Sequence, residues 1–260
     1  MTLLRTTADR IARSGQLVPL ALDAGPFTLA GYRRAGTMRG DTLIVYIEGD
    51  GNAWINRGRL AEDPTPSDPL ALRLAAADDA PNVVYLARPC QYVSGSAARH
   101  CHPRYWSTAR FAAEVVDGTS RAIDRVKADA GTRRIELIGY SGGGVLATLL
   151  AARRDDVSLV ITVGANLDVS AWTTHHRVTP LYESLNPIDF VARLTAVPQV
   201  IFVGGEDDIV PRAISERYRN AFPPGAPVRM IQRARFSHGC CWVEHWRELL
   251  GEARGSAIKH

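Results

Sequence analysis

The sequence is poor in lysine and has no long apolar stretch. Lysine occurs only at Lys127 and Lys259, so arginine supplies nearly all of the positive charge, and acidic residues are interleaved with it. The formal net charge is +4, but no basic block or basic helix marks a nucleic-acid surface. A run of about 18 apolar residues, which a membrane-spanning helix needs, is also missing. We therefore expect no nucleic-acid partner and no membrane span, and the oligomeric state stays open.

Residues 1–16 lack the apolar centre of a secretory signal peptide. On this absence alone, the expected location is the cytoplasm. The cysteines leave an alternative open, because Cys90 and Cys101 bracket a short loop and disulfides belong to oxidising compartments. A periplasmic or secreted location is expected instead if a signal was removed and the Cys90–Cys101 bond forms.

The cysteine pairing has several solutions. A Cys90–Cys101 bond would stabilise the fold by roughly 3 kcal/mol in the chain-entropy model, and two reduced, packed thiols are the alternative. Cys240 and Cys241 are adjacent. Neighbouring Cα atoms are about 3.8 Å apart, short of the usual disulfide range, so a bond between these two is expected to be strained. Free thiols or a Cys101–Cys240 link are equally open.

Length and patterning predict one α/β domain spanning residues 1–260. The chain is 46% hydrophobic and has no repeat or linker. Short β-rich runs alternate with helical patterns, which favours a mostly parallel sheet with helices on both faces. We expect about eight strands, near 17–23, 27–34, 42–48, 82–87, 134–139, 157–164, 199–204 and 228–232.

The most informative motif is the segment Gly139-Tyr-Ser-Gly-Gly143. An apolar, strand-like run precedes it, and apolar residues at helical spacing follow it. A serine on a sharp strand-to-helix turn has strained backbone geometry and needs small residues two positions before and after it. Gly139 and Gly143 meet that need, so the motif predicts a nucleophile elbow with Ser141 as the nucleophile.

An acid and a histidine follow the serine in the order that such an elbow requires. Asp207 comes just after the strand-like run 200–203, and His238 lies in a loop before the last helical segment. A serine hydroxyl is a weak nucleophile at neutral pH, so His238 would take its proton and Asp207 would orient the imidazole. Sequence order alone does not show that the three side chains meet.

With these residues in place, the chain resembles the α/β-hydrolase fold superfamily over most of its length. The segment Gly204–Pro211, which contains Asp207, looks like the acid loop after the seventh strand of many members, and His238 falls where their histidine loop lies. The resemblance implies an α/β-hydrolase fold. The loops between the strands are too short for a large cap domain.

The resemblance also implies an oxyanion hole made by the backbone N–H groups of Gly142 and Asp50. Here the chain departs from the pattern, because Glu48-Gly49 stands where many members carry His-Gly. A backbone donor does not depend on that side chain. An acidic side chain next to a developing oxyanion is nevertheless unfavourable unless it points away.

Other residues have alternative interpretations. Asp168 follows the sixth expected strand, where some relatives place their acid, and is the alternative to Asp207; the structural alternative is a loop residue that caps a helix. His100-Cys-His102 and His175-His176 lack partners at metal-ligand spacing, so no metal is expected. Trp242 and Trp246 are expected to pack in the core and to anchor the histidine loop.

Substrate choice must come from the loops beyond the strand ends. Trp54, Tyr92 and Trp172 lie on such loops and could line a pocket, or could pack beneath the loops. The loops are too short for a gating domain, so a shallow or partly open site is expected.

The leading expectation is therefore a cofactor-free serine hydrolase that cleaves carboxylic esters of small to moderate size through an acyl-enzyme, a carboxylesterase (EC 3.1.1). Its partner would be a small-molecule ester. Amide, peptide or thioester hydrolysis on the same three residues is the nearest alternative. A non-catalytic member of the fold that binds a ligand or a partner protein is an alternative of another class.

Overall fold

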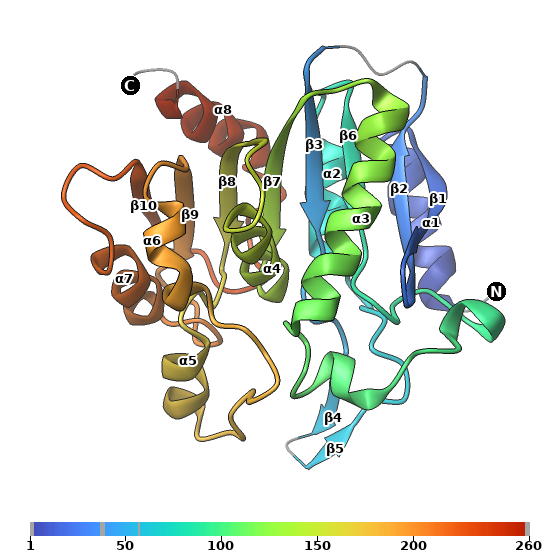
Figure 1. Ribbon diagram of the computed structural model, residues 1–260, viewed down its shortest axis with the longest axis horizontal. Coiled ribbons are helices and arrows are strands. Elements are labelled where there is room, and N and C mark those ends of the chain that lie inside the picture. Colours follow the sequence, from blue (N-terminus) through green and yellow to red (C-terminus); the bar gives the residue numbers. More distant parts are fainter. Residues whose placement is uncertain (1–2, 37–39, 57, 258–260) are drawn as a thin grey trace.

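In the computed structural model, residues 3–36, 40–56 and 58–257 are described. Their centre is an eight-stranded sheet in the order β1-β2-β6-β3-β7-β8-β9-β10 (Figure 1). All eight predicted strands are present, with ends within one residue of the expected ones: β1 (Leu17–Ala24), β2 (Phe27–Arg34), β3 (Thr42–Ile47), β6 (Val83–Leu86), β7 (Arg134–Tyr140), β8 (Val157–Val163), β9 (Gln199–Gly204) and β10 (Val228–Arg233).

The sheet is mostly parallel, as expected. β1 pairs antiparallel with β2, and β2 pairs antiparallel with β6. Every other pairing, from β6 through β3, β7, β8 and β9 to β10, is parallel. The carboxyl ends of six strands therefore meet at one edge of the sheet, which is where loops of α/β folds carry their functional residues.

Helices cover both faces of the sheet. One face packs on α1 (Leu3–Ser14), α2 (Leu70–Ala77) and α8 (Trp246–Ala257), and the other on α3 (Ala113–Ala130), α4 (Gly142–Ala151), α6 (Val191–Leu194) and α7 (Arg212–Asn220). In Figure 1, α3 and α4 lie in front of the sheet. Strands buried on both faces carry near-continuous apolar runs, and all four residues of β6 are buried.

The loops at the carboxyl edge carry short elements. A small hairpin of β4 (Trp54–Asn56) and β5 (Arg59–Leu60) and the helix α5 (Val169–His176) lie at the lower edge of Figure 1, toward which the arrow of β3 points. Single 3₁₀ turns complete these loops at Gly95–Ala98, Pro103–Trp106 and Pro187–Phe190. Within the described ranges, no helix combines the length and apolar character that crossing a membrane requires.

The structure pairs all four cysteines. Cys90 bonds to Cys101 with their Cα atoms 5.5 Å apart, which is one of the predicted solutions. Cys240 bonds to Cys241 at a Cα separation of 3.4 Å, the pairing for which the spacing predicts strain and one of those left open. Cys241 has a φ of +119°, a backbone conformation that L residues rarely adopt. Backbone geometry of this kind cannot be read from spacing.

Candidate active site

Ser141 stands on a tight turn between β7 and α4. Its φ of 51° and ψ of −123° lie outside the regions that residues with a side chain normally adopt. A Cβ on Gly139 would overlap the Gly143 carbonyl, and a Cβ on Gly143 would overlap the carbonyl oxygen of Ile47. Both positions of the motif therefore need glycine because backbone passes directly against them.

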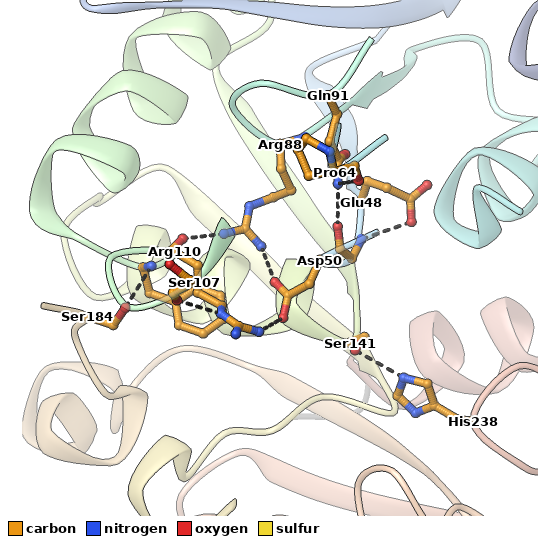
Figure 2. Close-up of polar contacts among 12 residues, drawn as sticks. Glu48, Asp50, Pro64, Arg88, Gln91, Ser107, Arg110, Ser141, Ser184 and His238 are labelled. Atoms are coloured by element: carbon orange, nitrogen blue, oxygen red, sulfur yellow. Dashed lines mark hydrogen bonds and ion pairs between the residues drawn. The ribbon is translucent and has the colours of Figure 1, made fainter. Parts of the chain in front are cut away.

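The serine, the histidine and the acid meet in space. His238 Nε2 lies 3.1 Å from Ser141 Oγ, and His238 Nδ1 lies 2.9 Å from Asp207 Oδ2. Figure 2 shows the ring of His238 turned toward Ser141. Along the chain, Ser141 is 97 positions from His238 and Asp207 is 31 positions from it. Distances of this kind let an imidazole withdraw the hydroxyl proton while a carboxylate holds its other nitrogen.

The acid loop fixes the carboxylate of Asp207. Its Oδ1 accepts the backbone N–H groups of Ile209 and Val210, at 3.0 and 2.7 Å. The side chain is fully buried, whereas that of His238 is 17% exposed. Because Oδ1 is occupied by the loop's own backbone, Oδ2 faces His238.

Trp242 holds the histidine loop, as expected. Its indole N–H is shared between the carbonyls of Ser237 and His238, at 3.0 and 3.1 Å. Trp246 has another role: its indole N–H donates to the hydroxyl of Tyr46 at 2.9 Å. The expectation of a loop anchor is therefore right for Trp242 and wrong for Trp246, which fastens α8 to the sheet.

Asp168 serves as a helix cap. Its carboxylate accepts the backbone N–H of Ala171 at 3.0 Å and pairs with Arg217 Nε at 2.9 Å. Such capping bonds satisfy N–H groups that the first helical turn leaves free. Among the residues described, the carboxylate that reaches His238 is that of Asp207. The geometry thus favours Asp207 over the alternative acid.

The loop after β3 packs on the elbow. A Cβ on Gly49 would lie 3.1 Å from the Tyr140 ring and 3.4 Å from Ser141 Cβ. The backbone N–H groups of Gly142 and Asp50 have no acceptor within the described part of the chain. Both donors expected for the oxyanion hole are therefore free at the two segments that meet around the nucleophile.

Glu48 points away from the nucleophile. Its buried carboxylate accepts the N–H of Gly49 at 2.9 Å, the hydroxyl of Tyr85 at 3.1 Å and the N–H of Ala71 at 3.4 Å. Ala71 lies in the first turn of α2, whose preceding Pro69 offers no side-chain cap. Burial raises the pKa of the Glu48 carboxyl to about 7. This residue therefore caps a helix and braces the loop.

The carboxylate of Asp50 is held by two arginines that sequence analysis did not identify. Arg88 Nη1 lies 3.0 Å from Oδ1 and Arg110 Nη1 lies 2.6 Å from Oδ2 (Figure 2). Burial would raise the pKa of the Asp50 carboxyl, but the charges of Arg110 and Arg88 and their hydrogen bonds outweigh it, and the pKa is lowered. The position of Arg88 just after β6 is the one sequence feature that could have placed it near the site. No sequence feature marks Arg110.

The three expected pocket residues have separate surroundings. Trp54 is 45% exposed on β4, and the backbone N–H of Tyr92 donates to Thr65 Oγ1 at 2.8 Å while its ring packs against the core on the α2 face. Trp172 lies in α5 and donates its indole N–H to the carbonyl of Ile209 at 2.7 Å. Within the described chain, no ring contact joins the three.

The histidines expected to be structural have ordinary partners. His100 Nε2 accepts a hydrogen bond from Arg99 Nε at 3.0 Å, and His176 Nε2 lies 2.8 Å from the carbonyl oxygen of Ile209. His175 and His176 are the last two residues of α5. In the described ranges, no three His, Cys, Asp or Glu side chains are grouped as metal ligands.

No family model matches the sequence, and no curated protein is similar to it. Solved structures are similar over nearly the whole chain. An esterase from Pyrococcus furiosus is 12% identical, with a TM-score of 0.66 and coverage of 94% of this chain and 93% of that one. An alpha-beta serine hydrolase homologue from Coxiella burnetii is 15% identical, with a TM-score of 0.57 and coverage of 93% and 96%.

An acylaminoacyl peptidase from Pyrococcus horikoshii is 16% identical, with a TM-score of 0.61. The match covers 93% of this chain and 40% of the peptidase. At such identities a likeness establishes the architecture and leaves the activity open. The chain has the α/β-hydrolase fold.

Proposed function

We propose that this protein is a serine hydrolase that cleaves carboxylic esters of small to moderate size through an acyl-enzyme. The observation that carries the proposal is the chain of contacts from Ser141 Oγ to His238 Nε2, at 3.1 Å, and from His238 Nδ1 to Asp207 Oδ2, at 2.9 Å. The strained φ of 51° at Ser141 supports it, because such strain is retained where a side chain must be presented in one orientation.

In the proposed reaction, Ser141 Oγ attacks the ester carbonyl as His238 Nε2 takes its proton. The positive charge that forms on the imidazole faces the buried carboxylate of Asp207, which stabilises it and holds the useful tautomer. The N–H groups of Gly142 and Asp50 donate to the tetrahedral oxygen. One such donor is worth about 3 kcal/mol in comparable sites.

Collapse of the tetrahedral intermediate breaks the bond to the alcohol oxygen, which leaves with the proton from His238. Water then gives its proton to His238 and attacks the acyl carbon, and Ser141 regains its proton as the acid departs. Each proton moves through His238 Nε2, and each turnover consumes one water molecule.

An ester is preferred as substrate because one structural neighbour is named an esterase. An acylaminoacyl peptidase is also among the neighbours, so amides must be tested beside esters. The carboxylesterase assignment, EC 3.1.1, therefore depends on the measured substrate preference.

The first test is labelling with a fluorophosphonate probe. We expect the wild type to be labelled and Ser141→Ala and His238→Ala to be unlabelled while their melting temperatures remain close to that of the wild type. A folded but unlabelled wild type would favour a non-catalytic binding protein. The second test is kinetics on p-nitrophenyl esters of increasing chain length and on peptide amides, where faster amide turnover would overturn the ester assignment.

A further inference from the structure

A cluster of three charged side chains lies beside the nucleophile and has no part in the proton transfers. Asp50 bridges Arg88 and Arg110, whose side chains are only 4% and 7% exposed. We propose that both arginines are positioning residues: by holding the carboxylate of Asp50, they aim its backbone N–H at the tetrahedral oxygen and surround that oxygen with net positive charge. This inference rests on the proposed hydrolytic function.

Three polar groups of the loop that carries Asp50 are bonded: the N–H and the carbonyl of Gly49, and the carboxylate of Asp50. The N–H of Gly49 donates to Glu48 Oε1 at 2.9 Å, and the carbonyl of Gly49 accepts from Gln91 Nε2 at 3.0 Å. The carboxylate of Asp50 is bonded to both arginines. Figure 2 shows these bonds converging on the loop from several sides. The N–H of Asp50 has no acceptor among the described residues, although the side chain of the same residue is held by two arginines. The bonded loop therefore leaves this donor available for a ligand oxygen.

The place of the carboxylate explains why two cations are needed. A Cβ on Gly142 would overlap the carboxylate of Asp50, so the carboxylate lies against the first residue of α4, next to Ser141. An unpaired anion there would repel the developing oxyanion and compete for the positive end of the helix. Two guanidinium groups against one carboxylate leave a net charge of +1, so the cluster attracts the developing oxyanion instead of repelling it.

The arginines are themselves fixed in place. Arg110 Nε donates to the carbonyl of Ser107 at 2.9 Å, and Arg88 Nη2 donates to the carbonyl of Arg110. The Arg88 guanidinium also lies 5.0 Å from the centre of the Phe111 ring. Buried ionic clusters are weak stabilisers, since apolar replacements are often as stable. Stability alone therefore does not account for this cluster at this place.

The test compares Arg110→Gln, Arg110→Lys and the control Arg254→Gln by ester kinetics. Arg254 also pairs with buried carboxylates, those of Asp78 and Glu136, but Glu136 lies near the start of β7, away from Ser141. We expect Arg110→Gln to lower kcat by about 10- to 100-fold with KM nearly unchanged, because an oxyanion contact acts in the transition state. Arg110→Lys should recover part of the loss, and Arg254→Gln should keep wild-type kcat.

Two further measurements separate positioning from a general effect on folding. Affinity for a boronic acid, a tetrahedral mimic, should fall with kcat/KM across the variants. In an Asp50→Ala background, Arg110→Gln should cause a smaller loss than it causes alone, because the carboxylate it holds is already gone and only the effect of its charge remains. Wild-type kcat in Arg110→Gln, a change confined to KM, or full additivity with Asp50→Ala would overturn the inference.

Failure of the proposed function is recognised separately, since the wild type would then neither hydrolyse the esters nor react with the fluorophosphonate. Hydrogen–deuterium exchange of the segment 47–53 then decides the positioning on its own. Faster exchange of that segment in Arg110→Gln than in Arg254→Gln supports it. Equal exchange in the two variants overturns it.

Discussion

Gly164 lies directly against the carboxylate of Asp207. A Cβ on Gly164 would stand 3.1 Å from Asp207 Oδ2 and 3.2 Å from His238 Nδ1, and Gly164 has a φ of +55°. The end of β8 therefore forms the wall behind the contact between acid and base. Any side chain there would push on the two atoms that must stay within hydrogen-bond distance.

We expect Gly164→Ala to lower kcat/KM by up to about 10-fold, because the acid and the base must shift by a few tenths of an ångström, and a misplacement of a full ångström can cost on the order of 100-fold. The matched control is Gly131→Ala. Gly131 has a φ of +66° and no atom within 4 Å of its built Cβ, so it has the same backbone strain without the contact. Equal losses of activity in the two variants would mean that strain alone is responsible.

Replacing each candidate acid tests the choice between Asp207 and Asp168. Asp207→Asn should lower kcat by about 10³- to 10⁴-fold, because an amide at this place favours the wrong imidazole tautomer. Asp168→Asn should keep kcat within a few-fold and lower the free energy of unfolding by at most about 1 kcal/mol, because the amide oxygen still caps α5 and only the pairing with the exposed Arg217 is lost. Ester kinetics and urea denaturation measure both, and the reverse pattern would move the assignment.

The strands and the elbow could be predicted because their signals are local. Gly139 and Gly143 lie within two residues of Ser141, and each strand is a short β-rich run. Local patterns of this kind can be recognised without knowing which distant residues contact them.

The order of serine, acid and histidine allowed both Asp168 and Asp207. The resemblance of the segment Gly204–Pro211 to the acid loop of the superfamily favoured Asp207, and the hydrogen bond to His238 required the structure.

The cluster around Asp50 could not be predicted, because its bonds span 38 and 60 residues. A buried arginine looks like any surface arginine in a sequence that contains many. The first helix, α1, was also missed, since the residues it buries are the small Ala8 and Ala12. An apolar stripe is nevertheless present, since Ala8, Ile11 and Ala12 recur at helical spacing and pack against the core.

Glu48 makes stability depend on pH. Burial raises the pKa of its carboxyl from an ordinary 4.5 to about 7, so between these values the folded protein keeps a proton that the unfolded chain releases. The contribution of this residue to stability therefore falls as pH rises from about 4.5 to about 7. We expect Glu48→Gln to gain stability relative to the wild type across this window, by on the order of 3 kcal/mol at most.

Urea denaturation at pH 5 and at pH 8 measures that difference. The exposed residue Glu62 offers a control, since Glu62→Gln should differ from the wild type equally at both values. A difference between Glu48→Gln and the wild type that stays constant with pH would show that the carboxyl titrates normally.

The Cys90–Cys101 bond closes a loop that contains Gln91. Arg88 lies two residues before this loop. We expect Cys90→Ser/Cys101→Ser to lower the free energy of unfolding by about 3 kcal/mol, as the loop-closure model gives for a sequence separation of 11. Activity should fall too, since Arg88 bonds to Asp50 and Gln91 bonds to Gly49, next to the nucleophile. The control is Cys240→Ser/Cys241→Ser, because the bond between these neighbours closes almost no loop. An equal loss of stability in the control would contradict the explanation by loop-closure entropy.

Trp172 allows the pocket hypothesis to be separated from an anchoring role. Its indole N–H donates to the carbonyl of Ile209 at 2.7 Å, and the N–H of Ile209 donates to Asp207 Oδ1 at 3.0 Å. The side chain thus ties α5 to the loop that orients the acid. Trp172→Phe keeps an aromatic side chain, although a smaller one, and removes this bond, which is worth about 1 kcal/mol.

If Trp172 acts as an anchor, Trp172→Phe should lower kcat a few-fold for every p-nitrophenyl ester, because the acid is less well oriented whatever the acyl chain. If it lines the pocket, the loss should depend on acyl length and should appear in KM. Trp54→Phe, in the exposed hairpin, provides the comparison. We expect the uniform loss for Trp172, because a side chain already bonded to the acid loop cannot turn toward a substrate without releasing it.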